Sequence, residues 1–290
     1  MEQMTRTVYC SALQSGLYLN LPIPIKPNST LNERFSIQAG VLPTIDNPPR
    51  ARYYSLGNGG HTFTVGSDMI PKPEPIQHRT TDAAAFKPIP FVLRLVANDL
   101  TPVQRANYGL RRFETWQGQQ YVAYYLKRID FTGVTVDMQY KTQNADGTWT
   151  STEFVPDSSN LNPTPPDLSP TGINLVTGAY VSADARVDLS LSASDCQELI
   201  NVANVMFGDP RAAIISEVLL CSGVDQNVTV PGPGNTTFNF LEVIASQVMT
   251  FVEAFALANF LNNGLDILLD VGATEPLLNL NGTTTVTTSP

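Results

Sequence analysis

The chain has 290 residues, of which 42% are hydrophobic and 9% aromatic, and its formal net charge is -9. This composition excludes a largely disordered chain, while 22 prolines and 19 glycines indicate many turns and short strands. Three cysteines without a C-x-x-C spacing imply neither a disulfide framework nor a zinc site. The length allows one large β-rich domain or two smaller ones, and we favour two.

Charge is distributed unevenly along the chain. Residues 1–141 carry 15 Lys and Arg against 10 Asp and Glu, a net of +5, whereas residues 142–290 carry 2 against 16, a net of -14. One interpretation is drift in surface composition, since charge says little about fold. The sharper one is a dipolar protomer whose basic half contacts the acidic half of the next copy, in a ring or a stack.

The first hundred residues alternate between extended segments and turns. Met1–Arg6 lacks the order of basic, apolar and small residues of a signal peptide, so we expect no export by that route. Residues 5–21 show short apolar alternations, and the proline-rich residues 21–27 are expected to run across a neighbouring surface or a sheet edge. Residues 57–60 (GNGG) precede an alternating strand at residues 61–65, which favours a tight turn over a phosphate-binding loop.

A basic and aromatic region follows a predicted buried strand at residues 91–96. Thr101 and Pro102 predict the start of a short helix over residues 102–110. Acidic residues are interleaved with the basic ones and no nucleic-acid motif is present, so we expect a protein interface and no sequence-specific nucleic-acid binding. The interface candidates here are Arg105, Arg111, Arg112, Trp116, Lys127 and Arg128.

Residues 119–155 predict a three-stranded antiparallel meander. Alternating apolar and polar residues at 134–141 indicate a half-buried strand, and residues 148–154 are rich in β-branched and aromatic side chains. The turn between them, residues 144–147 (NADG), places glycine where a positive φ is needed. Residues 120–127 supply the third strand.

The predicted domain boundary coincides with the change of charge. Residues 157–172 contain four prolines among polar residues, which is typical of a linker. We therefore divide the chain into a β-rich domain (residues 1–156), this linker, a mixed domain (residues 173–280) and a Thr-rich tail (residues 281–290). The fold class is α+β, with β-strands and two or three helices in the C-terminal domain.

Helices are predicted mainly in that second domain. One begins at Ser194 with a capping box and ends at Gly208, whereas periodicity does not decide between helix and strand for Arg211–Cys221. The longest predicted helix, Phe240–Asn262, is apolar around much of its circumference. Its Glu242 and Glu253 fall on one side and are further interface candidates, and without flanking basic anchors we expect no membrane span.

No group of residues predicts catalysis, and we expect no cofactor or metal. His61 and His78 lack a second ligand or a nucleophile motif nearby, so we interpret them as structural or exposed. Asp146 and Glu153 lie on the predicted hairpin, where two carboxylates normally form a solvated face. Trp116, Trp149 and the tyrosines provide an alternative, an aromatic platform for sugars.

Four segments resemble an uncharacterised family of virion structural proteins from tailed double-stranded DNA bacteriophages. They are residues 98–111 (NDLTPVQRANYGLR), 124–134 (YYLKRIDFTGV), 156–166 (PDSSNLNPTPP) and 216–224 (SEVLLCSGV). The resemblance implies a non-enzymatic, multi-copy component of the neck, collar or baseplate, assembled in the host cytoplasm with copies of itself and neighbouring virion proteins. A capsid decoration protein and a carbohydrate-binding tail adhesin are the alternatives.

Overall fold

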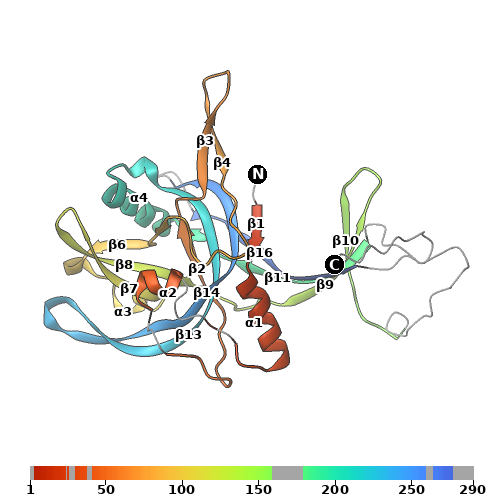
Figure 1. Ribbon diagram of the computed structural model, residues 1–290, viewed down its shortest axis with the longest axis horizontal. Coiled ribbons are helices and arrows are strands. Elements are labelled where there is room, and N and C mark those ends of the chain that lie inside the picture. Colours follow the sequence, from red (N-terminus) through yellow and green to blue (C-terminus); the bar gives the residue numbers. More distant parts are fainter. Residues whose placement is uncertain are drawn as a thin grey trace, which may run out of the picture. The chain divides into compact units, whose positions relative to one another are not determined.

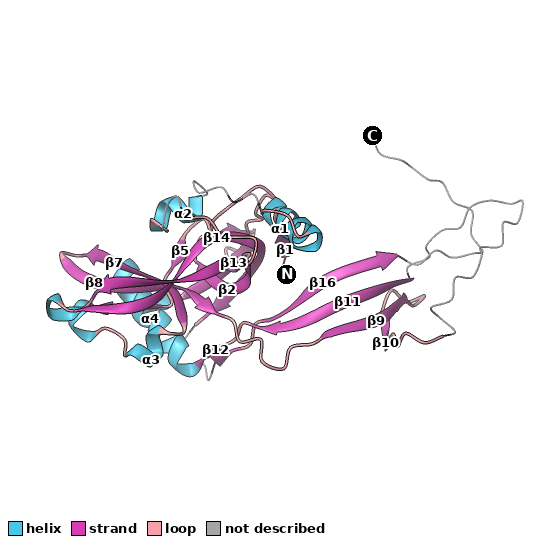
Figure 2. Cartoon of the chain, turned by 90° about the horizontal axis from the view of Figure 1, so that it is seen from below, coloured by secondary structure: helices cyan, strands magenta, loops and turns pink. Residues whose placement is uncertain are grey.

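The computed structural model describes residues 3–23, 25, 30–37, 41–158, 179–258 and 264–276 (Figure 1). The chain forms two compact units: unit 1 comprises Met1–Ile129 and Leu189–Ile267, and unit 2 comprises Asp130–Asp188 and Leu268–Pro290. Strands dominate both units and helices occur in unit 1, which confirms the strand-rich α+β class (Figure 2).

Unit 1 is organised around an eight-stranded antiparallel sheet. The strands run in the order β1-β14-β13-β2-β8-β6, with β5 paired to β2 and β7 paired to β8. A second, two-stranded pairing joins β12 (Leu191–Ser192) to β15 (Gly264–Leu265). The bounds of the large sheet are β1 Gln3–Arg6, β2 Arg50–Gly57, β5 Pro88–Ile89, β6 Val92–Leu95, β7 Tyr108–Trp116, β8 Gln119–Arg128, β13 Ile214–Pro231 and β14 Thr237–Leu257.

The predicted helix Phe240–Asn262 is wrong, because β14 occupies Thr237–Leu257 and pairs along its length with β13. Residues 242–251 are buried on both faces of this strand. A strand covered on both faces is apolar at consecutive positions, and such a run imitates a helix that is apolar all round. The same pairing makes most of Arg211–Cys221 strand β13, preceded by a 3-10 turn, η2 (Pro210–Ala212).

Four α-helices accompany the sheet. Both α1 (Val8–Leu19), which the sequence analysis missed, and α2 (Thr30–Phe35) pack against β14, whereas α4 (Ala193–Phe207) packs against β6. The predicted helix ending at Gly208 is confirmed, but its capping box uses Ser192 and Asp195, two residues earlier than expected. After the predicted cap at Thr101, α3 spans only Pro102–Arg105, because the following residues join β7. Two further 3-10 turns are η1 (Val96–Asn98) and η3 (Pro233–Asn235).

A separate hairpin projects from the body of unit 1 (Figure 1). It consists of β3 (His61–Val65) and the proline-rich β4 (Pro71–Pro75), which pair only with each other among the described strands. At its base, the ring of Phe255 on β14 makes edge contacts with His61 and Phe63. We call residues 61–75 the hairpin arm.

Unit 2 contains one four-stranded antiparallel sheet in the order β10-β9-β11-β16. The β9–β10 hairpin turns at Gly147, whose φ of 84° confirms the predicted glycine position. The three-stranded meander is wrong, because β8 pairs with β7, β6 and β2 of unit 1. The strand bounds are β9 Val136–Gln143, β10 Trp149–Glu153, β11 Ala179–Asp188 and β16 Leu268–Pro276.

These units differ from the predicted domains. Unit 2 begins at Asp130, upstream of the predicted boundary, and takes its last strand from residues beyond 267. Antiparallel pairing of β11 with β9 and β16 joins segments that are far apart in sequence, which a single cut along the chain does not capture. Beyond Ser158 the predicted linker lies outside the described residues, as does the Thr-rich tail. Among the described helices, none is long and apolar enough to cross a membrane.

Candidate functional site

The predicted basic interface residues are engaged in internal ion pairs. Arg105 and Arg111 both contact Asp99, at 3.2 and 2.8 Å, and the side chains of Arg111 and Asp99 are buried. Lys127 lies 2.6 Å from Asp195 at the start of α4, and Arg128 lies 2.5 Å from Asp225 on β13. Four of the predicted candidates therefore hold unit 1 together.

The charge split of the sequence is largely neutralised within the fold. Because β13, β14 and α4 pack against the N-terminal strands, basic residues of the first half meet acidic residues of the second. Besides Lys127 and Arg128, the pairs of this kind among the described residues are Arg52–Asp225, Arg94–Glu198, Arg112–Glu242 and Lys141–Asp184. The structure therefore does not present separate basic and acidic halves.

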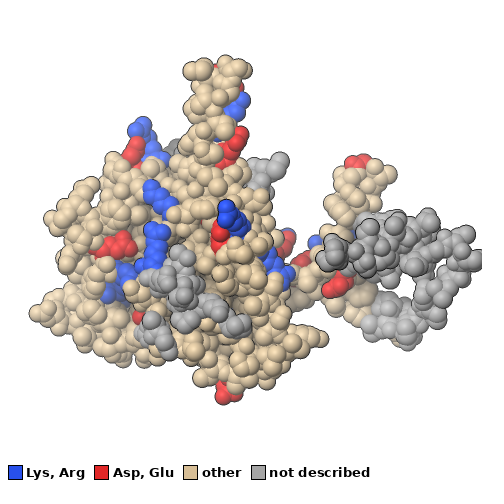
Figure 3. All heavy atoms as spheres, in the orientation of Figure 1, with Lys and Arg blue, Asp and Glu red and all other residues tan. Residues whose placement is uncertain are grey.

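Charge is instead divided between the two units. Unit 1 contains 15 Lys and Arg against 16 Asp and Glu, a net of -1, whereas unit 2 contains 2 against 10, a net of -8. Together these give the net charge of -9. Figure 3 shows blue basic side chains in several separate groups on the visible face of unit 1.

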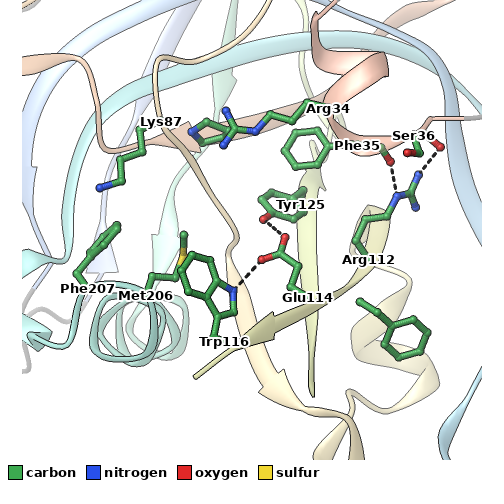
Figure 4. Close-up of a pocket in the computed structure, with 12 residues that line it drawn as sticks. Arg34, Phe35, Ser36, Lys87, Arg112, Glu114, Trp116, Tyr125, Met206 and Phe207 are labelled. Atoms are coloured by element: carbon green, nitrogen blue, oxygen red, sulfur yellow. Dashed lines mark hydrogen bonds between the residues drawn. The ribbon is translucent and has the colours of Figure 1, made fainter. Parts of the chain in front are cut away.

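A cleft in unit 1 brings together two of the predicted candidates, Arg112 and Trp116, with residues that the sequence analysis did not select. It has a volume of about 550 Å³ and lies where α2, the end of α4, β7 and β8 meet (Figure 4). Its lining residues are Arg34, Phe35, Ser36, Lys87, Pro88, Arg112, Phe113, Glu114, Trp116, Tyr125, Met206 and Phe207.

The carboxylate of Glu114 in the cleft wall is held by two donors. The indole Nε1 of Trp116 donates to one of its oxygens at 3.0 Å, and the hydroxyl of Tyr125 donates to the other at 2.5 Å (Figure 4). Burial, together with the charge of Glu114, raises the pKa of Tyr125 well above its ordinary value. The phenol therefore stays protonated and remains a donor to Glu114, so both carboxylate oxygens have partners inside the wall.

Two cations of the cleft have no carboxylate partner among the residues that the structure describes. Arg34 and Lys87 are exposed, and neither is within ion-pair distance of an Asp or Glu in the described part of the chain. The ammonium of Lys87 lies 4.0 Å from the ring centroid of Phe207. Arg112, by contrast, binds Glu242 and donates to the backbone oxygen of Ser36 at 3.1 Å. Arg34 and Lys87 with their aromatic neighbours therefore suit an anionic group attached to an apolar body.

No local sequence signal identifies Arg34 or Lys87. Arg34 lies in the last turn of the six-residue helix α2, and Lys87 follows a loop 53 positions later. Only the packing of α2 and α4 near β7 and β8 brings them to one cleft. No regular spacing of residues along the sequence predicts that these two side chains share a cleft. Trp116 and Arg112 were found because aromatic and basic residues cluster locally on β7.

A second cluster of polar groups lies deep inside unit 1, around His78. The Nδ1 of His78 is 3.0 Å from Asp82 and its Nε2 is 2.8 Å from Glu217. The ring stacks between Phe86 and Phe251, with centroids 4.0 and 3.7 Å away. Burial alone would lower the pKa of His78, but the hydrogen bonds and charges of Glu217 and Asp82 outweigh it and raise the pKa.

The glycine-rich loop at residues 57–60 wraps this cluster. The carboxylate of Glu217 accepts hydrogen bonds from the backbone N–H of Gly59 at 2.9 Å and of Phe86 at 2.8 Å. A Cβ at Gly60 would lie 2.5 Å from the Glu217 side chain, which explains the need for glycine. The loop therefore connects two strands, as predicted, and also binds an internal carboxylate.

Glu253, a predicted interface residue, belongs to this buried cluster. It faces Glu217 across the β13–β14 pairing, and one of its oxygens accepts from the backbone N–H of His78 at 2.9 Å. Its other oxygen has no hydrogen-bond partner in the described part of the chain, and both carboxylates are fully buried. Phe86 and Phe251 cover the two faces of the imidazole, and both of its nitrogens contact carboxylates, so the cluster ties β13, β14 and the loop before β5 together.

The remaining aromatic and acidic candidates lie in unit 2. The ring of Trp149 packs edge-on against Tyr180, with centroids 5.2 Å apart, and about half of Trp149 is exposed. Asp146 accepts hydrogen bonds from Thr148 in the hairpin turn, and Glu153 is exposed on β10. No group of three or more His, Cys, Asp or Glu residues suited to a metal ion occurs in the described parts of either unit.

Comparison with known proteins places the chain in one family. Residues 1–286 match DUF7208, a family of unknown function, so the chain belongs to that family. Neither curated proteins nor solved structures gave a match.

Proposed function

We propose that this member of the DUF7208 family is a non-enzymatic structural subunit of a tailed-bacteriophage virion, present in many copies in a neck, collar or baseplate ring. The four segments that resemble phage virion proteins support the assignment of the chain to a phage virion. The hairpin arm supports a role in assembly.

The hairpin arm is the observation that carries the proposal. Phe63, Val65, Met69 and Ile70 are each more than half exposed on it. A two-stranded hairpin without a covering layer is only marginally stable in water, and clustered exposed apolar side chains indicate a protein partner. The arm therefore extends apolar surface away from unit 1 in the way that an assembly contact with a neighbouring copy requires.

The sheet of unit 2 supports the same role. Val136, Met138 and Tyr140 alternate along β9, so they lie on one face, and all three are exposed. Among the described residues of unit 2, the buried apolar side chains are Val187 and Leu269. A sheet ordinarily buries one face against another layer, and a neighbouring subunit would supply that layer.

Self-association is tested with the double variant Val65→Ser and Ile70→Ser, which removes apolar surface from the hairpin arm. We expect the parent chain to sediment as an oligomer and the variant to shift toward monomer, because apolar burial contributes about 25 cal/mol per Å². Val103→Ser is the matched control, since Val103 is 81% exposed on α3, away from the arm. A monomeric parent chain would contradict the proposal.

The location in the particle is tested by mass spectrometry of separated head and tail fractions from purified virions. We expect the chain in the tail fraction at multiple copies. Recovery with the heads would favour a capsid decoration protein, and absence from both fractions would overturn a virion role. Saturable glycan binding that is lost in Trp149→Ala would instead support an adhesin.

A further inference from the structure

We propose that the cleft containing Arg34 and Lys87 receives the acidic segment Glu153–Asp157 from unit 2 of a second copy of this chain. This inference rests on the self-assembly proposed above. It adds the site and the segment through which one copy recognises another.

The chemistry of the cleft suits such a segment. Its two exposed cations have no ion pair with a carboxylate among the described residues, and its lining carboxylate, Glu114, already accepts from Trp116 and Tyr125. An incoming carboxylate therefore meets Arg34 and Lys87 without displacing an existing ion pair. The aromatic rings that line the same cleft offer apolar surface to the rest of the segment.

The cations of this cleft also contrast with others in unit 1. Arg111, Lys127 and Arg128 are paired with carboxylates and mostly buried, and releasing them for a partner would leave buried charges without counter-ions. When Arg34 and Lys87 bind a partner, no buried ion pair has to be broken. The exposed cations of the cleft are therefore better suited to recognition than the buried, paired cations that the sequence analysis selected.

The charge distribution identifies the occupant as unit 2. This unit has a net charge of -8, against -1 for unit 1. A contact from the cleft of one copy to unit 2 of the next joins two different surfaces. Contacts of this kind are head-to-tail and close into a ring when the rotation between copies allows it.

Within unit 2, residues 153–157 (EFVPD) combine two carboxylates with apolar residues. Glu153 ends β10 and is exposed, with no ion pair in the described part of the chain, and Val155 is more than half exposed. The backbone N–H of Phe154 donates to Met138 at 2.9 Å, which holds the start of the segment extended beside β9. Pro156 also restricts its own φ, so little conformational entropy is lost on binding.

The test reverses charge on each side of the proposed contact in the full-length chain. The cleft variant is Arg34→Glu with Lys87→Glu, and the segment variant is Glu153→Lys with Asp157→Lys. Each alone is expected to weaken self-association about tenfold or more in sedimentation, because like charges then face each other. An equimolar mixture of the two is expected to recover association, since the reversed cleft of one variant matches the reversed segment of the other.

Arg50→Glu is the matched control, because Arg50 is exposed, lacks an ion pair among the described residues and does not line the cleft. It should associate like the parent, and circular dichroism should show that all variants fold. If the parent is an oligomer and charge reversal leaves it unchanged, or the mixture fails to recover association, the inference is overturned while the proposed function stands. Binding of single-stranded DNA that is lost in the cleft variant would assign the cleft to nucleic acid instead. A monomeric parent overturns both proposals.

Discussion

The two units use charge in opposite ways. Unit 1 is nearly neutral, and its buried or half-buried cations are matched with carboxylates, as in the pairs of Asp99 with Arg105 and Arg111. Unit 2 is strongly acidic; its Lys141–Asp184 pair is partly buried, whereas its Arg186–Asp270 pair is largely exposed. Ion pairs withdrawn from water support a unique internal arrangement, whereas unbalanced surface charge acts on other molecules. The unbalanced charge of unit 2 fits the contact surface that we propose for it, whereas unit 1 is internally neutralised.

The two units also differ in how far their side chains are buried. Unit 1 has a core that includes the fully buried rings of Tyr53, Tyr124 and Phe251. In unit 2 the described strands β9 and β10 are mostly exposed. Stability should therefore respond strongly to substitutions in unit 1 and weakly to those in unit 2, and the following predictions test this contrast.

The largest effect is expected from Phe251→Ala. Phe251 is fully buried and stacks on His78, so the substitution should lower the free energy of unfolding by about 3–5 kcal/mol. Phe255 on the same strand is 43% exposed, and Phe255→Ala should cost less than half as much. Val136→Ala on β9 is the comparison in unit 2 and should change stability by less than about 0.5 kcal/mol. Urea denaturation of the three variants measures these losses of unfolding free energy and their order.

An intermediate effect is expected from Lys127→Gln. Its ammonium lies 2.6 Å from Asp195, and both side chains are mostly buried, so loss of this charged hydrogen bond should cost about 1.5–3 kcal/mol. Arg186→Gln breaks the exposed pair with Asp270 in unit 2 and should cost less than about 0.5 kcal/mol. Equal losses of unfolding free energy in the two variants would contradict the expectation that the buried ion pair contributes more to stability than the exposed one. The measurement is thermal unfolding at low and at high salt.

The smallest effect is the pH dependence contributed by His78. Because Glu217 and Asp82 raise its pKa above the ordinary value of 6.5, its contribution to stability is fully present below that value and is lost as pH rises through the folded pKa. The neighbouring Glu253 accepts a hydrogen bond from the backbone N–H of His78. This bond does not involve the imidazole, so it is kept when the ring loses its proton or is replaced. The stability difference between the parent chain and His78→Gln should therefore shrink from about pH 6 to pH 9. Chemical denaturation at both values checks this, and a difference that grows with pH would contradict it.

Sequence reasoning succeeds where the signal is short and local. Thr101 caps α3, Gly208 ends α4 with a φ of 73°, and Gly147 turns the β9–β10 hairpin. Each of these features depends on a few adjacent residues, because the side chain of each residue limits the backbone conformations that it can adopt. Two of the interface candidates, Arg112 and Trp116, line the cleft, and their role at an interface stays a prediction.

Sequence reasoning fails where the cause lies on a distant strand. The residues of β14 have a helical apolar pattern only because β13 and β1 flank the strand and its two faces are buried. In the sequence-based interpretation Glu253 lies on one side of a helix as an interface candidate, whereas the pairing with Glu217 places it beside His78. Arg34 and Lys87 share a cleft through packing alone.

The sequence by itself therefore determined the strand-rich α+β class, the capped helix before Gly208 and the hairpin at Gly147. These follow from side-chain periodicity and from the few residue types that tolerate caps and tight turns. Only the tertiary structure decided that β14 is a strand, that basic residues of the first half neutralise acidic residues of the second, and that net charge collects in unit 2. The physical reason is that strand pairing, burial and ion pairing depend on which distant segments meet, and chain order does not record that.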